Sequence, residues 1–245
     1  VEGAMWVEAD CNLTSGESLV RQIVYGKQFI KEEFNQDSQI LWLPDVFGYS
    51  AALPQILKKT NTPYFMTTKI SWNQFNQIPC DTFYWKGIDG SEVLTHFITT
   101  VSEAYSPTPY YTTYNGLLDP FSIKGSWKRY LQKDINDEVL VAYGYGDGGG
   151  GPTIEMLENA KRLNKGLPGM PKVESTTPKA FFQKLENTIA DKKVPKWMGE
   201  LYFEYHRGTY TSMAQNKKYN RQVENLLQSV EKIYSLLDLE KYPQA

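Results

Sequence analysis

Two carboxylates each follow an apolar run of the chain. Asp45 comes directly after residues 40–44, and Asp147 lies on the glycine-rich loop 144–152 that follows the apolar residues 139–143. Cleavage of a glycosidic bond needs two such groups, one ionised as the nucleophile and one protonated as the general acid. Aspartate beside glycine also commonly shapes a turn. The pattern alone therefore leaves a catalytic and a structural interpretation open for both residues.

Four other features could support chemistry, and each has an alternative. The loop 144–152 could cradle a phosphate, but it lacks the Gly-Lys-Ser/Thr ending of a P-loop, and Pro152 removes one amide donor. His96, inside an apparent strand, is typical of a core or rim histidine. His206, near the end of an extended segment, fits a polar pocket or a hydrogen bond that stabilises the fold. Trp72 could stack on a sugar or close the core.

The elements that must position these residues alternate between strands and helices. The sequence predicts a capping box, with Thr14 as N-cap and Glu17 at N3, for the first helix. An Asp-Gly pair at 89–90 predicts a hairpin between two strands. We expect strands at 6–10, 40–43, 64–68, 82–86, 92–99 and 139–143, and helices at 14–34, 51–59, 126–133, 153–163 and 177–189. This alternation predicts an α/β sheet or barrel with largely parallel strands.

The remaining segments suggest where the pocket and a second domain lie. Residues 102–125, with four tyrosines and no clear period, are interpreted as a long surface loop that frames the pocket. Residues 191–196 resemble a linker, and 200–206 alternate so that Glu200, Tyr202, Glu204 and His206 would share one face of an extended segment. Apolar residues recur at helical spacing from 213 to 239. That helix needs a partner, so a helical domain is expected to begin at about residue 199.

Composition excludes several classes of partner. The 245 residues include 26 Lys+Arg and 28 Asp+Glu, a formal net charge of -2, which favours neither nucleic acid nor an anionic membrane. No apolar run is long enough to span a membrane, and the first residues lack the regions of a signal peptide. Two cysteines without CxxC spacing fit a reducing, cytoplasmic compartment. Six Trp and 17 Tyr suit stacking on sugars as well as core packing.

Several specific motifs occur in order along the chain. They are WVEAD at 6–10 with SGESLVRQ at 15–22, LWLPDVFGY at 41–49, TKISWN at 68–73 and GYGDGGGGP at 144–152. With these motifs the sequence resembles the α-mannosidases of glycoside hydrolase family 38, especially their cytosolic and bacterial branch. The resemblance covers nearly the whole chain. It implies a retaining, zinc-dependent hydrolase of terminal α-mannosides, with a mannose-containing oligosaccharide as substrate.

The resemblance also assigns roles to individual residues. The aspartate of the family's Pro-Asp-x-Phe-Gly motif is both nucleophile and zinc ligand, and it corresponds to Asp45. The general acid/base would be Asp147. The sugar pocket would be lined by Asp10, Lys69, Trp72, Tyr145 and His206.

The family's other zinc ligands have no counterpart here. They come from a His-x-Asp motif and a Phe-His-Asp segment, and neither His96 nor His206 matches these. The resemblance thus implies an internal piece of a larger enzyme, which could assemble as a homo-oligomer. Residues 1–198 would be the C-terminal portion of the catalytic α/β domain, and 199–245 the beginning of the helical middle domain. Since catalytic zinc ordinarily needs three protein ligands, the isolated chain is expected to be inactive.

Two functions of other classes compete with this interpretation. The segment could act as a non-catalytic carbohydrate-binding or interaction module, which would bind mannose without zinc. It could also belong to a metal-dependent carbohydrate deacetylase on a related barrel, which would release acetate instead of mannose.

Overall fold

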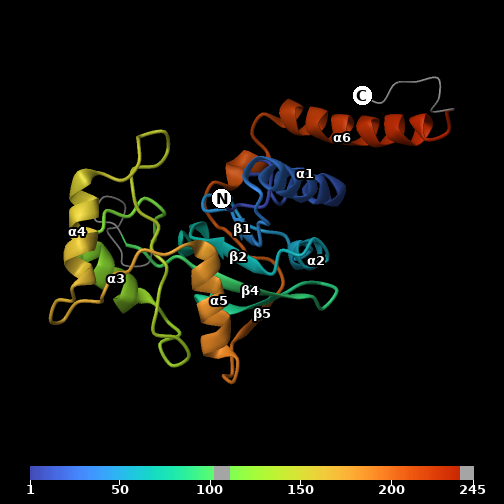
Figure 1. Ribbon diagram of the computed structural model, residues 1–245. Coiled ribbons are helices and arrows are strands. Elements are labelled where there is room, and N and C mark those ends of the chain that lie inside the picture. Colours follow the sequence, from blue (N-terminus) through green and yellow to red (C-terminus); the bar gives the residue numbers. More distant parts are fainter. Residues whose placement is uncertain (102–110, 238–245) are drawn as a thin grey trace.

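A mixed five-stranded sheet forms the centre of the molecule (Figure 1). The structure is a computed structural model, and it describes residues 1–101 and 111–237. The sheet order is β1-β2-β4-β3-β5, and all neighbours are parallel except β3 and β4. The strands are β1 (Ile40–Trp42), β2 (Tyr64–Thr67), β3 (Thr82–Lys86), β4 (Glu92–Phe97) and β5 (Lys196–Met198). Because β1, β2 and β4 run the same way, the loops that follow them meet at one edge of the sheet.

Helices cover both faces of this sheet. Leu41 and Phe65 point to the same core as helices α1 (Gly16–Phe34) and α2 (Leu53–Lys59). Their neighbours Ile40, Tyr64 and Met66 point to a second core, which packs against α5 (Pro178–Ile189). Successive side chains of a strand face opposite sides of a sheet, so burial of both faces requires the continuous apolar runs seen in the sequence.

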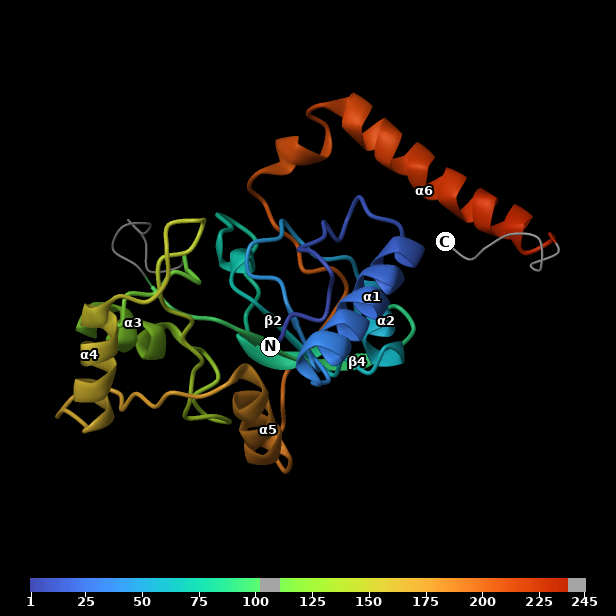
Figure 2. The same cartoon turned by 45° about the horizontal axis from the view of Figure 1, so that its top comes forward.

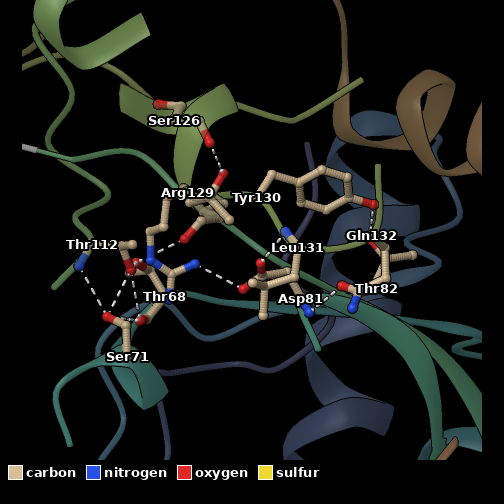
Figure 3. A network of polar contacts seen from close by, with 12 residues as sticks. Thr68, Ser71, Asp81, Thr82, Thr112, Ser126, Arg129, Tyr130, Leu131 and Gln132 are labelled. Carbon is tan, nitrogen blue, oxygen red and sulfur yellow. Dashed lines mark hydrogen bonds and ion pairs between the residues drawn. The ribbon is translucent and has the colours of Figure 1, made fainter. Parts of the chain in front are cut away.

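A smaller lobe lies at one end of the sheet and contains α3 (Pro120–Arg129) and α4 (Ile154–Asn164) (Figure 1). A buried polar network holds it to the sheet (Figure 3). Arg129 Nη1 lies 2.8 Å from the carboxylate of Asp81, which is 1% exposed and just precedes β3. The Leu131 amide donates to the other Asp81 oxygen at 3.0 Å. A charge buried this deeply is tolerated because it is paired and hydrogen-bonded.

The last helix, α6 (Ala214–Tyr234), projects away from the sheet (Figure 2). It contacts the start of the chain through charged groups, including an ion pair between Arg21 and Glu231 and a hydrogen bond from the Ser15 amide to Glu224. Its apolar side chains Val223, Leu226, Leu227, Val230 and Ile233 are exposed. The described residues therefore do not provide the apolar partner that the sequence predicts for this helix, and the helical bundle stays a prediction.

The mixed α/β fold with a mostly parallel sheet is confirmed, as are the hairpin and the helices predicted near 51–59, 153–163 and 177–189. Closure into a barrel and the division into domains at 198/199 stay predictions. Within the two described ranges, no helix is long and apolar enough to cross a membrane. Cys11 and Cys80 are free and buried.

Two predicted strands do not form. The Trp6 amide donates to Gln22 O of α1, and the flanking residues Gly3 and Cys11 make isolated bridges to Leu41 and Tyr49. Residues 139–143 make a single bridge, from Tyr143 to Gly116. Leu140 packs into the α5 core while Val141 packs into the small lobe. An apolar run shared between two cores has the hydrophobicity of a buried strand without needing strand partners.

Several boundaries also differ from the prediction. Helix α1 is capped by Ser15, whose hydroxyl accepts from the Ser18 amide, and not by Thr14. The helix expected at 126–133 is α3, which starts earlier because Asp119 caps it and Pro120 follows at N1. The expected linker 191–196 runs directly into β5. The segment 200–206 makes only the Leu201–Tyr49 bridge and then turns at His206, whose φ of 59° is left-handed.

Candidate active site

Asp45 lies on the loop after β1, at the edge where the parallel strands end. Its backbone amide donates to Glu8 Oε1 at 3.0 Å, and its Oδ1 lies 2.6 Å from Lys69 Nζ. Oδ1 is buried and accepts no hydrogen bond of normal geometry from the described residues, so the ion pair is its main polar contact. The buried Tyr49 hydroxyl donates to Leu43 O at 2.6 Å and fixes the start of this loop.

Lys69 is held by aromatic rings as well as by Asp45. It begins a short 3-10 helix, η1 (Lys69–Ser71), directly after β2. Its ammonium lies 4.6 Å from the ring centroid of Trp72, 5.5 Å from that of Phe47 and 6.0 Å from that of Phe203. A cation near aromatic faces is stabilised by their negative electrostatic potential. These contacts place a fixed positive charge beside the carboxylate expected to be the nucleophile.

Asp147 approaches Asp45 from the glycine-rich loop. Its Oδ1 accepts a hydrogen bond from the Tyr114 hydroxyl at 2.6 Å, and its Oδ2 accepts one from Asn115 Nδ2 at 3.1 Å. The same Tyr114 hydroxyl lies 3.4 Å from Asp45 Oδ2. The two carboxylate oxygens on either side of this phenol are therefore at most about 6 Å apart, and retaining glycosidases hold their two carboxylates about 5–5.5 Å apart.

The glycines of this loop are explained by its own geometry. Gly144 has a φ of 115°, and a Cβ there would lie 2.8 Å from the Pro152 nitrogen. The Tyr145 amide donates to Gly151 O, which closes the loop on itself. Asp147, with a φ of 53°, also takes the left-handed conformation. Tight closure of the loop, which presents Asp147, accounts for the glycine at position 144.

Ionisation at the site is shaped by burial. Burial, the hydrogen bond to Asp147 and the charge of Asp45 raise the pKa of Tyr114, so its hydroxyl stays protonated and acts as a donor. Burial raises the pKa of Glu8, opposed by its hydrogen bond from the Asp45 amide. Burial and the neighbouring Lys69 lower the pKa of His206, whereas Asp45 raises it. His206 therefore favours the neutral imidazole.

The other predicted pocket residues divide into two groups. Trp72 contacts Lys69 and stacks on Tyr111, and the His206 ring lies 4.8 Å from that of Phe47, so both belong to the site. Asp10 instead accepts from the Asn12 and Leu13 amides and closes a turn. Tyr145 is 52% exposed. Among the described residues, no hydrogen bond or ring contact joins Asp10 or Tyr145 to either catalytic candidate.

The remaining histidine is a core residue, as the sequence predicts. His96 is fully buried, with Nδ1 2.9 Å from Thr82 Oγ1 and Nε2 3.4 Å from the Leu140 amide. Burial lowers its pKa to about 3.

Sequence reasoning missed four residues of the site: Glu8, Phe47, Tyr114 and Phe203. Glu8 and Phe47 lie inside motifs already singled out, beside the residues that were chosen. Tyr114 belongs to the tyrosine-rich loop that was expected to frame the pocket, and nothing in its spacing distinguishes it from the loop's other tyrosines. Phe203 comes from far along the chain.

The described residues do not complete a zinc site. No group of three or more His, Cys, Asp or Glu side chains in residues 1–101 and 111–237 is placed to hold a metal ion. The buried Oδ1 of Asp45 pairs with Lys69 Nζ at 2.6 Å, and a catalytic zinc needs at least three protein ligands.

Two family descriptions match this chain. Residues 1–200 match "Glycosyl hydrolases family 38 N-terminal domain", and residues 204–245 match "Alpha mannosidase middle domain". Among solved structures, an alpha-mannosidase from Enterococcus faecalis is similar in fold, with a TM-score of 0.57 and 17% identity over 81% of this chain and 22% of that one.

Curated relatives are similar over almost the whole chain. Alpha-mannosidase G of Dictyostelium discoideum is 46% identical over 237 residues, which are 97% of this chain and 20% of that protein. Alpha-mannosidase 2C1 of Homo sapiens is 40% identical over 241 residues, 96% of this chain and 21% of that protein. An alpha-mannosidase of Saccharomyces cerevisiae is 41% identical over 235 residues, 94% of this chain and 21% of that protein. The chain thus spans about a fifth of the length of these relatives.

Proposed function

The chain belongs to glycosyl hydrolase family 38, and from that premise we propose that it is part of a retaining α-mannosidase that hydrolyses terminal α-mannosides. In this proposal Asp45 is the nucleophile and Asp147 the general acid/base. The observation that carries it is the pair of contacts through which the Tyr114 hydroxyl joins these two carboxylates. Their spacing of at most about 6 Å supports a double-displacement mechanism with retention.

The proposed reaction has two steps. In the first, Asp45 attacks the anomeric carbon while Asp147 gives its proton to the glycosidic oxygen, and the leaving group departs. In the second, Asp147 removes a proton from water, whose oxygen attacks the anomeric carbon and releases the Asp45 carboxylate. Lys69 balances the charge of Asp45 before attack and after release. Trp72 and His206 line the same region and are proposed to contact the sugar.

We also propose that Asp45 is one ligand of a catalytic zinc whose other ligands lie outside the described residues. Bound zinc would supply a Lewis acid that binds sugar hydroxyls and stabilises charge at the transition state. The 245-residue chain by itself is then expected to bind zinc weakly and to show little turnover. Residues 1–198 are proposed as the later part of a catalytic domain, barrel-like when complete, and 199–245 as the start of a helical middle domain in a cytoplasmic enzyme.

Turnover of an aryl α-mannoside by the longer enzyme tests these assignments. Asp45→Asn and Asp147→Asn should each lower kcat by at least about a hundredfold, because each removes a group that acts in the transition state. Asp37→Asn is the matched control, since Asp37 also pairs with a lysine but lies outside the site. Normal turnover by Asp45→Asn would show that the nucleophile is misassigned. Activity of the purified 245-residue chain near that of the longer enzyme would contradict the zinc proposal.

A further inference from the structure

We propose that Tyr114 is a positioning residue whose hydroxyl alternates between the two carboxylates during the reaction. It donates to Asp147 when that carboxylate is ionised, and it turns toward Asp45 when Asp147 carries the proton. The starting point is the observed geometry, in which one hydroxyl lies 2.6 Å from Asp147 Oδ1 and 3.4 Å from Asp45 Oδ2. This inference rests on the catalytic roles proposed above for these two residues.

The backbone that carries Tyr114 is fixed on the β2 side by Thr112. The Thr112 hydroxyl contacts the hydroxyls of Thr68 and Ser71, and its amide donates to Ser71 Oγ at 3.0 Å (Figure 3). Thr112 O accepts a hydrogen bond from Trp72 Nε1 at 2.8 Å. Thr112 is 2% exposed. Tyr114 is thus tied to the segment that also carries Lys69.

On its other side, Tyr114 is tied to the segment that carries Asp147. The Gly116 amide donates to Ala142 O at 3.1 Å, and the Gly144 amide donates to Gly116 O at 2.9 Å. A Cβ on Gly116 would lie 2.7 Å from Ala142 O, so the two backbones are in close contact. Tyr114 is therefore held between the strand end that presents Lys69 and the loop that presents Asp147.

This placement has a chemical consequence in each step. When Asp147 gives up its proton to the leaving group, the carboxylate that forms can accept the Tyr114 hydrogen bond, which stabilises it as the charge appears. When Asp147 takes a proton from water, the Tyr114 hydroxyl is free to donate to Asp45 as that carboxylate leaves the sugar. The phenol itself stays protonated throughout, so no proton is gained or lost at Tyr114.

Substrates that differ in leaving group test this role in the longer enzyme. Tyr114→Phe removes only the hydroxyl. With methyl α-mannoside, whose leaving group needs a proton, kcat/KM should fall about 10- to 100-fold, the loss expected for one hydrogen bond to a charged group. With 2,4-dinitrophenyl α-mannoside, whose leaving group departs without one, the loss should be less than about threefold.

Tyr64→Phe is the matched control. The Tyr64 hydroxyl also donates to a carboxylate, that of Glu186 at 2.7 Å, but it lies in the α5 core. Its removal should leave the ratio of the two kcat/KM values unchanged. Partial unfolding lowers both rates equally, so the ratio also distinguishes positioning from a loss of stability.

The outcomes separate this inference from the function on which it rests. Suppose that Asp45→Asn and Asp147→Asn abolish turnover, but that Tyr114→Phe lowers kcat/KM equally for both substrates or leaves both values unchanged. The role of Tyr114 is then overturned and the proposed function stands. If the two aspartate variants keep normal turnover, the proposed function fails, and this inference fails with it. A leaving-group-dependent loss in Tyr114→Phe, with no change of the ratio in Tyr64→Phe, is the expected result.

Discussion

Replacing Lys69 by methionine should separate the electrostatic role of this residue from its packing. Methionine keeps most of the length and the apolar contacts of the side chain but removes the ammonium, which lies 2.6 Å from Asp45 Oδ1 and near three aromatic rings. The Lys69 side chain is 12% exposed and that of Asp45 is 35% exposed, so water screens the pair in part. We expect the free energy of unfolding to fall by about 1–3 kcal/mol, less than for a fully buried pair.

The effect on catalysis should be larger than the effect on folding. Without the ammonium, the Asp45 carboxylate loses the contact that holds its Oδ1 in place for attack on the anomeric carbon, so kcat/KM for an aryl α-mannoside should fall about 10- to 100-fold in the longer enzyme. Urea unfolding of the 245-residue chain measures the first quantity, and steady-state kinetics of the enzyme measures the second.

Lys27→Met is the matched control for this substitution. The Lys27 side chain is 17% exposed, its Nζ lies 3.2 Å from Asp37, and it also donates to the carbonyl oxygens of Thr60 and Asn61. It should lose a similar amount of stability without a loss of turnover by the folded enzyme. Equal losses of kcat/KM in the two variants would refute the electrostatic role of Lys69.

Two further predictions concern stability. The buried His96 stays neutral in the folded chain because burial lowers its pKa to about 3, whereas the unfolded chain takes up a proton below the ordinary value of 6.5. The free energy of unfolding should therefore fall as pH drops from 6.5 toward 3, by up to about 1.4 kcal/mol per pH unit from this group. Urea titrations of His96→Gln should show a shallower dependence of this free energy on pH. An unchanged slope in this variant would contradict the prediction. Gly26→Ala should lower the free energy of unfolding by about 1–3 kcal/mol, because its Cβ would lie 2.2 Å from Ala4 O, whereas Gly16→Ala, with nothing within 4 Å, should change it little. Equal unfolding midpoints for the two alanine variants would show that residues 4–6 can move away from α1 without a loss of stability.

The parts of the site that could be predicted follow from regular structure. Asp45 and Lys69 each come after a buried parallel strand, and the ends of such strands meet at one edge, so this pattern is sufficient to predict their proximity. Tyr114 could not be chosen in this way. Its position depends on hydrogen bonds of Thr112 and on backbone contacts of Gly116, which join segments without any repeating pattern.

Two errors in the fold have a related cause. The apolar residues 139–143 have the composition of a buried strand, but Leu140 and Val141 enter two different cores. Hydrophobicity reports burial and does not report which partner supplies the backbone hydrogen bonds. In the same way, residues before Trp197 look like a polar linker because β5 is a short edge strand whose end residues, Lys196 and Met198, are exposed.

In the proposed mechanism, Asp45 forms the covalent bond to the sugar. A mannosyl fluoride with a second fluorine beside the reacting carbon slows release of the glycosyl-enzyme, because the fluorine destabilises the positive charge of the transition state. After incubation of the longer enzyme with this compound, digestion and mass spectrometry locate the modified residue. We expect one added glycosyl group on Asp45 of the unmodified enzyme, and none in Asp45→Asn. A label on Asp147 or Glu8 instead would contradict it.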